Sequence, residues 1–313
     1  MSSELILHHY ANSPFSEKVR LVLGFKGLSW RAVDVPKLLP KPDAIALTGG
    51  YRRTPFLQIG ADIYCDTALI CRVLDALHPE PPLYPESTAG LSEILAEWAD
   101  TALFWAAVPF TLQPAGLPHI MAGMTPEILK AFGADRASMS PNRRRATLAD
   151  GGAQLHAYLA RIEHLLADGR PFLLGALPGI ADFAAAQSIW FIRLAPPVAT
   201  LLEAYPRVLH WHAQVEAFGQ GRATPMSSTE AIELARAAQG RSAPTTFRAE
   251  TGLDEGDEVS VTPTDYAHDP VTGRLVGLGP HEVVIARTDA RAGAVHVHFP
   301  RIAFQIKPTA AAK

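Results

Sequence analysis

The segment 53–75 constrains the fold of this chain more than any other stretch. Thr54-Pro55 comes directly before a short apolar run, Phe56–Ile59, and a Gly-Ala-Asp turn leads to a second run, Ile63–Cys65. Asp66-Thr67 then opens a stretch with apolar residues at helical spacing. Proline has no backbone donor, so it belongs at the start or edge of a strand. The segment therefore predicts two short strands followed by a helix.

The same residues offer a set of groups that suits a small peptide. An X-Pro bond in a tight turn is the one place where a cis peptide is cheap, and it would turn the backbone N–H and C=O of Thr54 outward, ready to pair with an extended chain. Asp66 and Thr67 add an acceptor and a hydroxyl at a helix N-terminus, where partial positive charge favours a carboxylate. We therefore expect a site for a peptide with a free carboxylate and a free amine.

The N-terminal residues agree with this interpretation. Residues 5–27 read as strand, turn and amphipathic helix, and Ser13-Pro14 gives that helix a serine cap followed by proline at its first position. The two motifs, in this order and spacing, resemble the glutathione-binding site of the glutathione transferase family. The resemblance covers roughly residues 4–225 and implies a thioredoxin-like α/β domain followed by an all-helical domain.

The resemblance implies a catalytic role for Ser13. Aligning Val19-Arg20 with the common Val-Arg of the first helix places Ser13 where other classes carry their catalytic Ser or Cys. Its hydroxyl would donate to the sulfur of glutathione and stabilise the thiolate. Ser16 is the alternative, since S-P-F-S echoes the C-P-F-C of glutaredoxins. Taken alone, Ser13 needs no role beyond capping the helix.

The resemblance also assigns the peptide-binding residues. The Thr54 backbone, before Pro55, would pair with the cysteinyl unit of glutathione, and Asp66 and Thr67 would hold its γ-glutamyl amine and carboxylate. Arg53 could meet a carboxylate, or it could be a solvated surface arginine. The aromatic candidates for the second-substrate pocket are residue types that more often belong to a core than to a pocket; they are Tyr10, Phe15, Phe104, Trp105 and Phe110.

Composition changes along the chain predict three domains: a thioredoxin-like glutathione-binding domain at 1–78, an all-α helical bundle at 88–240, and a small all-β, barrel-like domain at 245–313. A proline-rich connector separates the first two, and Arg241–Pro244 begins the change to the third. In the helical part, apolar residues at helical spacing predict an amphipathic helix; they are Leu91, Ile94, Leu95, Trp98, Ala99 and Leu103. Where the family usually has a Ser or Thr cap three residues before Asp182, this chain has Gly179, so only half of a capping box is expected.

Bulk properties exclude several kinds of partner. A net charge of −3 gives no electrostatic footprint for nucleic acid or an anionic membrane. The longest apolar stretch, Ala176–Leu202, is interrupted by Asp182, Gln187 and Arg193, which favours a buried helix over a membrane span. The two cysteines, Cys65 and Cys71, form no disulfide framework, and the first ten residues lack the basic region of a signal peptide. We expect a cytoplasmic protein.

Histidine pairs were considered as metal ligands. His8 and His9 are adjacent on a strand and point to opposite faces. His296 and His298 share a face, and His281 could join them, but no carboxylate or cysteine partner is evident in the nearby sequence and a polar outer face explains the pattern. We expect no metal.

Together these features predict a homodimeric glutathione transferase that uses glutathione as co-substrate against a small electrophile of unknown identity, in the manner of detoxification enzymes. Serine in place of cysteine favours conjugation, thiol addition, isomerisation or dehalogenation over disulfide chemistry. The alternative is a non-catalytic binding or scaffold protein that acts through the C-terminal β domain, since a fold does not settle function.

Overall fold

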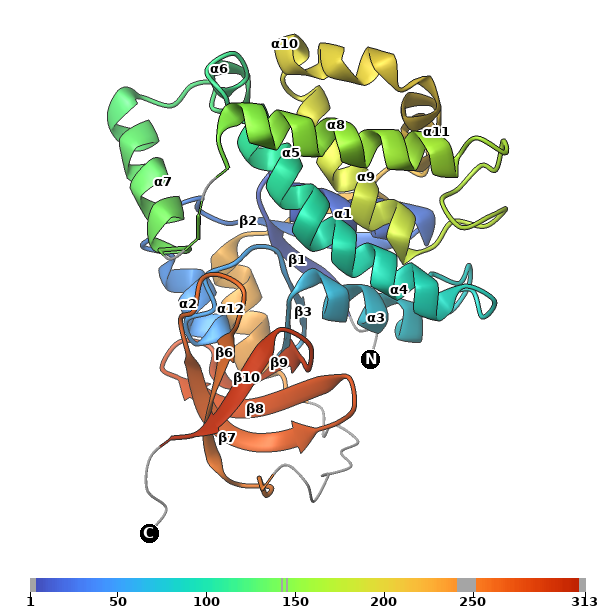
Figure 1. Ribbon diagram of the computed structural model, residues 1–313. Coiled ribbons are helices and arrows are strands. Elements are labelled where there is room, and N and C mark those ends of the chain that lie inside the picture. The colour runs from blue at the N-terminus through green and yellow to red at the C-terminus, as the bar shows by residue number, and fades with distance from the viewer. Residues whose placement is uncertain (1–3, 142, 145, 241–251, 310–313) are drawn as a thin grey trace.

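The computed structural model describes residues 4–141, 143–144, 146–240 and 252–309 (Figure 1). The predicted connection at 241–244 lies outside these residues. The described chain forms the three expected parts: a thioredoxin-like α/β part, a helical part, and a C-terminal region of β-strands. In Figure 1 the helical part lies on one side of the central strands and the C-terminal strands, in orange and red, lie on the other.

The N-terminal part has the predicted βαβ and ββα order. Its elements are β1 (Ile6–His9), α1 (Pro14–Phe25), β2 (Ser29–Asp34), α2 (Pro42–Thr48), β3 (Phe56–Ile59), β4 (Asp62–Cys65) and α3 (Thr67–Leu77). β1 pairs with β2 in parallel and with β3 antiparallel, and β3 pairs with β4 antiparallel. Apolar residues of α1 and α3 join the core of the helical part on one face, while those of α2 lie on the opposite face of the sheet.

The helical part is arranged around one buried helix. Its elements are α4 (Ala89–Trp98), the π-helical η1 (Ala99–Leu103), α5 (Phe104–Thr111), α6 (Leu117–Ile120), α7 (Pro126–Ser138), α8 (Leu148–Leu165), α9 (Ile180–Arg193), α10 (Pro196–Ala199), the 3-10 helix η2 (Thr200–Ala204) and α11 (Pro206–Glu216). α9 packs against α1, α4, α5 and α11. It belongs to the apolar stretch that was expected to be buried, and among the described residues no helix is long and apolar enough to cross a bilayer.

One part of the predicted apolar stripe on α4 is wrong. Leu91 and Ile94 are 57% and 68% exposed, whereas the buried face of α4 and η1 runs through Ser92, Ala96 and Ala99. These three residues lie four and three positions apart and form a narrow buried stripe that shares Ala99 with the expected one. Two large apolar side chains are thus left on the surface.

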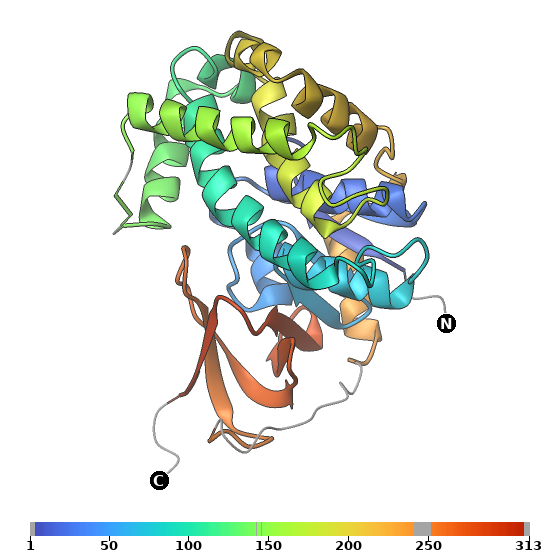
Figure 2. The same ribbon diagram turned by 45° about the vertical axis from the view of Figure 1, so that its right-hand side comes forward.

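The C-terminal region extends the central sheet. It follows β5 (Arg222–Pro225) and α12 (Ser228–Ala237), and its strands are β6 (Glu258–Pro263), β7 (Val271–Leu278), β8 (Glu282–Asp289), β9 (Gly293–Pro300) and β10 (Phe304–Pro308). A C-terminal β domain was expected, but not its junction with the central sheet: β9 pairs in parallel with β4, which gives one ten-stranded sheet in the order β10-β6-β7-β8-β9-β4-β3-β1-β2-β5. Figure 2 shows how strongly these strands curve away from the helices.

The apolar core of the C-terminal region is shared with the N-terminal part. One cluster of buried residues joins Leu47, Tyr51 and Phe56 to Val261 and Phe299. The strands therefore fold around side chains that the thioredoxin-like part supplies.

Candidate functional site

The turn between β1 and α1 carries Ser13 in the predicted capping position. Its Oγ accepts a hydrogen bond from the backbone N–H of Ser16 at 3.2 Å, and its own N–H donates to the carbonyl of Tyr10 at 3.2 Å. Ser13 is 2% exposed and lines a large cavity. Ser16 is completely buried in α1 and does not line that cavity. Because Oγ of Ser13 uses a lone pair for the cap, its O–H remains able to donate to a ligand.

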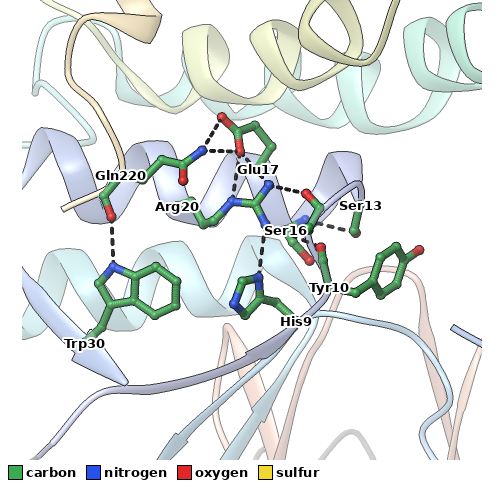
Figure 3. A network of polar contacts seen from close by, with 9 residues as sticks. His9, Tyr10, Ser13, Ser16, Glu17, Arg20, Trp30 and Gln220 are labelled. Carbon is green, nitrogen blue, oxygen red and sulfur yellow. Dashed lines mark hydrogen bonds and ion pairs between the residues drawn. The ribbon is translucent and has the colours of Figure 1, made fainter. Parts of the chain in front are cut away.

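A buried polar network supports the turn that carries Ser13 (Figure 3). Nε and Nη2 of Arg20 donate to the carboxylate of Glu17 at 2.9 and 2.6 Å, and Nη2 also donates to the carbonyl of Ala11 at 2.8 Å. Nη1 donates to Nδ1 of His9 at 3.0 Å. Burial, together with the charge of Arg20, lowers the pKa of His9 to about 4, so its imidazole is neutral and accepts.

The helical part completes the network through Gln220. Its side-chain amide donates to both carboxylate oxygens of Glu17, at 3.0 and 2.8 Å, and its backbone carbonyl accepts from Nε1 of Trp30 at 2.8 Å (Figure 3). Gly24 of α1 allows the segment with Gln220 to pack this closely, because a Cβ at position 24 would lie 2.0 Å from the carbonyl oxygen of Gly219. The turn that carries Ser13 is therefore held by contacts from the thioredoxin-like part and from the segment around Gln220.

The residues predicted to bind the peptide lie directly before β3 and at the start of α3. The Thr54-Pro55 bond is cis, as anticipated, and Thr54 lines the cavity. Asp66 caps α3 by accepting from the N–H of Ala68 at 2.9 Å, and it adopts a positive φ of 75°, which is rare outside glycine. The hydroxyl of Thr67 accepts from Lys18 at 3.3 Å. Pro55, Asp66 and Thr67 do not line the cavity itself.

Lys18 and Asp100 stabilise this end of the site. Nζ of Lys18 lies 2.5 Å from the carboxylate of Asp100, which the π-helical turn η1 presents, and Asp100 also accepts from Gln187 at 2.6 Å. Burial raises the pKa of Asp100 to about 6, although its bonds to Lys18 oppose the shift.

Arg53 is neither exposed nor free. Its guanidinium forms an ion pair with Asp265 from the loop between β6 and β7, donates to the carbonyl of Tyr266, and lies over the Tyr266 ring with its central carbon 3.8 Å from the centroid. Asp66 lies 3.9 Å from the same guanidinium. The solvated-surface interpretation of Arg53 is therefore wrong, and its charge is already matched by acidic residues of this chain.

The cavity has a volume of about 990 Å³ and lies between the thioredoxin-like part and the helical part. All five aromatic candidates line it: Tyr10, Phe15, Phe104, Trp105 and Phe110. Tyr266 also lines it and meets the Trp105 ring edge-on, with centroids 5.6 Å apart. The C-terminal region thus contributes one wall of the cavity.

Lys41 is a cavity residue that sequence reasoning missed. It is 5% exposed, and its ammonium makes two long hydrogen bonds, to the carbonyl of Arg52 at 3.3 Å and to Oγ1 of Thr54 at 3.5 Å. Burial, reinforced by the charge of Arg136, lowers its pKa to about 8. A buried ammonium beside Thr54 is suited to receive an anionic group.

The histidine prediction requires a correction. His298 is buried rather than on a polar outer face, and it lies between two carboxylates: Nε2 is 3.2 Å from Asp62 and Nδ1 is 3.0 Å from Glu282. These acids come from β4 and β8, far from His298 in sequence, so spacing along the chain could not reveal them. In the described residues no group of three or more ligating side chains could hold a metal ion.

Comparison with known proteins decides the family. A family model for the N-terminal domain of glutathione S-transferases matches residues 7–82, and one for their C-terminal domain matches residues 145–214. A GST-like protein from Pseudomonas syringae is 42% identical, and the match covers 97% of this chain and 100% of that chain with a TM-score of 0.82. This chain belongs to the glutathione transferase family.

Other relatives cover less of this glutathione transferase family member. FtsZ-localized protein A of Caulobacter vibrioides (strain NA1000 / CB15N) is 27% identical over 194 residues, which are 60% of this chain and 77% of that protein. A glutathione S-transferase from Rhodospirillum rubrum F11 is 23% identical over 68% of this chain and 88% of its own, with a TM-score of 0.54, which shows a shared fold. The match to the Pseudomonas syringae protein is wide enough to include the C-terminal strands.

Asp265 and Tyr266 are the other residues of the candidate site that the sequence did not reveal. They lie more than 200 positions after Arg53, and the residues around them read as an ordinary polar turn. No local signal distinguishes them from any other loop. Their place at the cavity depends on the pairing of β9 with β4, which brings the loop between β6 and β7 to the cavity.

Proposed function

We propose that this protein is a glutathione-dependent transferase in which the Ser13 hydroxyl stabilises the glutathione thiolate. One observation carries the proposal: Ser13 caps α1 and lines a cavity of about 990 Å³ together with Thr54, whose peptide bond to Pro55 is cis. A free thiol titrates near pH 8.5, so glutathione needs such stabilisation at neutral pH.

The chemistry follows from the donors available in the turn. The thiol of glutathione releases its proton to solvent, and the O–H of Ser13 donates to the resulting thiolate beside the N-terminus of α1. One unit of pKa corresponds to about 1.4 kcal/mol, which one charge-assisted hydrogen bond can supply. The thiolate then attacks an electrophilic carbon: a C–S bond forms, and the leaving group departs with its bonding electron pair.

Glutathione would span the two halves of the site. We assign its cysteinyl backbone to Thr54, its γ-glutamyl end to Asp66 and Thr67, and one of its carboxylates to Lys41. Lys41 supports this assignment because its ammonium lies within hydrogen-bond distance of Thr54 and has no carboxylate within 4 Å in the described part of the chain. Arg53 would interact with the ligand less strongly than an unpaired arginine, because Asp265 already forms an ion pair with it.

Replacement of Ser13 tests the catalytic assignment. Ser13→Ala should lower turnover by about tenfold or more, the equivalent of one lost charge-assisted hydrogen bond, while glutathione affinity stays within a few fold. Ser227→Ala is the matched control, because Ser227 caps α12 in the same manner outside the cavity. Steady-state kinetics that show equal turnover in both variants would reduce Ser13 to a helix cap.

A calorimetric titration of glutathione into the full-length protein tests the site itself. We expect micromolar-to-millimolar binding with a stoichiometry near one per chain. Failure to bind glutathione by a folded protein would favour the second candidate function, a non-catalytic binding protein. The ion pair of Arg53 with Asp265 is the observation that favours this candidate, and the similarity to FtsZ-localized protein A agrees with it.

We further propose that the protein is a cytoplasmic homodimer. The exposed Leu91 and Ile94 on α4 are apolar side chains that a second subunit could cover. Sedimentation analysis of wild-type protein and a Leu91→Ser, Ile94→Ser double variant would test the assembly, with a monomeric variant expected.

A further inference from the structure

The charges around the cavity are all of one sign. Among the described residues that line it, every side chain that is charged at neutral pH is a lysine or an arginine, and none is an aspartate or glutamate. Three of these cations have acidic partners behind the wall: Arg52 and Arg136 share Asp135, and Arg53 pairs with Asp265. The other lysines and arginines of the lining make no ion pair within 4 Å in the described residues, although Asp265 attracts Arg143 from a greater distance.

The cations that lack a carboxylate within 4 Å in the described residues fall into two groups. Lys37 and Lys41 lie near the glutathione end, where Lys37 is 5.8 Å from the Tyr10 ring and Lys41 is beside Thr54. Arg143 and Arg144 lie on the connection between α7 and α8, where Arg143 packs on Trp105. The proposed role of Lys41 toward glutathione leaves this second group without a ligand.

Arg143 is exposed, and its guanidinium packs on an aromatic ring. Its guanidinium carbon lies 3.8 Å from the centroid of the Trp105 ring, and Trp105 itself contacts Phe104 and Tyr266. Stacking of this kind holds a guanidinium in place while its N–H groups stay available at the edge. A cation is therefore fixed next to the aromatic lining of the cavity.

We propose that the electrophile accepted by this cavity is an anionic aromatic molecule, whose ring packs against the aromatic lining and whose carboxylate or sulfonate is bound by Arg143 with Arg144. The proposal rests on the proposed transferase function for the reaction, but the binding of the anion does not. The reacting carbon lies toward Ser13, where the thiolate of glutathione forms the new C–S bond and the leaving group departs as an anion.

A matched pair of electrophiles tests the substrate class. A chloronitrobenzoate, with chlorine para and nitro meta to the carboxylate, and its methyl ester undergo the same reaction: the C–S bond forms, the C–Cl bond breaks, and chloride leaves with the electron pair. For each, kcat/KM is divided by the uncatalysed rate with free glutathione, which corrects for the different reactivity of acid and ester. We expect the wild type to favour the acid by about tenfold, as one charge-assisted hydrogen bond provides.

Variants locate the preference in the structure. Arg143→Gln combined with Arg144→Gln should bring the normalised acid-to-ester ratio close to one. Lys130→Gln is the control, because it removes one positive charge from an exposed position on α7 that does not line the cavity. An equal rate for acid and ester in the wild type, or a preference that survives in the double variant, would overturn the proposal.

A binding measurement separates this proposal from the proposed function. A nitrobenzoate with a ring methyl group in place of the chlorine has no leaving group. Its affinity relative to the methyl ester of the same acid can be measured by calorimetry without glutathione. Preferential binding of the acid, lost in the double variant, would support the anion site even if the protein conjugates nothing. Conjugation of both electrophiles with equal affinity for acid and ester would support the transferase and overturn the anion site.

Discussion

Lys41 shows at the scale of one residue how a binding group is kept at the expense of stability. Its ammonium is buried and makes no ion pair with any residue that the structure describes, and burial lowers its pKa from 10.5 to about 8. The unfolded chain therefore binds more protons than the folded chain between pH 8 and 10.5, so the free energy of unfolding rises with pH over that range. Below pH 8 the folded protein carries the full cost of the buried charge.

We predict that Lys41→Met stabilises the protein at pH 7 by about 1 to 3 kcal/mol and weakens glutathione binding at the same time. The gain should shrink toward pH 10, where the wild-type amine is mostly neutral. Urea unfolding at both pH values and calorimetry with glutathione check the two effects, and Lys130→Met serves as a control on an exposed lysine. A variant that binds glutathione as tightly as the wild type would remove Lys41 from the site.

At the scale of one element, α9 obtains its N-terminal cap from another helix. As expected, only half of a capping box exists: the Asp182 carboxylate accepts from the N–H of Gly179 at 2.9 Å. The missing hydroxyl comes from Ser92 of α4, whose Oγ accepts from the N–H of Ala181 at 3.1 Å. A Cβ at position 179 would lie 2.8 Å from that Oγ, so glycine makes room for the substitute cap.

This arrangement predicts a rescue. Ser92→Ala should cost about 1 to 2 kcal/mol, the usual value of an N-cap, and Gly179→Ser should also destabilise because it crowds Ser92. The double variant should be more stable than Ser92→Ala alone, since the new serine caps α9 directly and the crowding is gone. Urea unfolding of the four proteins gives the coupling, and strictly additive effects would contradict the exchange of caps.

At the scale of the whole molecule, a buried histidine connects the C-terminal strands to the thioredoxin-like part. His298 of β9 lies between Asp62 of β4 and Glu282 of β8. Burial alone would lower its pKa, but the hydrogen bonds to the two carboxylates outweigh burial and raise it above 6.5. Its stabilising contribution is therefore complete below pH 6.5 and is lost as the pH rises through the folded-state pKa.

We predict that His298→Gln destabilises the protein by about 3 kcal/mol at pH 6 and that the loss shrinks toward pH 9, because a buried charged pair is broken only where the imidazole is protonated. Urea unfolding across this range provides the measurement. The exposed His210 is a suitable control, since His210→Gln should show no such pH dependence. An equal loss at both pH values would mean that His298 contributes by packing alone.

The contact of the C-terminal region with the cavity gives a second prediction at this scale. Deletion of residues 245–313 should yield insoluble protein, because it exposes Leu47, Tyr51 and Phe56 of the shared core. Asp265→Asn should leave the fold intact and strengthen glutathione binding about fivefold, since Arg53 then keeps only the longer ion pair with Asp66 among the described residues. Solubility and calorimetry test the two effects; unchanged affinity in Asp265→Asn would show that Arg53 only braces the loop.

The sequence by itself determined the elements whose signals are local. Ser13-Pro14, the cis Thr54-Pro55 bond and the Asp66 cap each follow from neighbouring residues, and alternating apolar residues indicated the C-terminal β region. These features depend on backbone geometry and side-chain spacing within a few positions, which a sequence records directly.

Only the tertiary structure decided what the strands and charges do. The pairing of β9 with β4, the matching of Arg53 by Asp265 and the cap that Ser92 supplies to α9 all join residues far apart in the chain. The polar edge strand β5 and the exposed Leu91 and Ile94 likewise depend on which neighbour is present rather than on spacing. Long-range contacts are selected by the packing of the whole core, because the periodic pattern of an element fixes which side it buries but not which partner covers it.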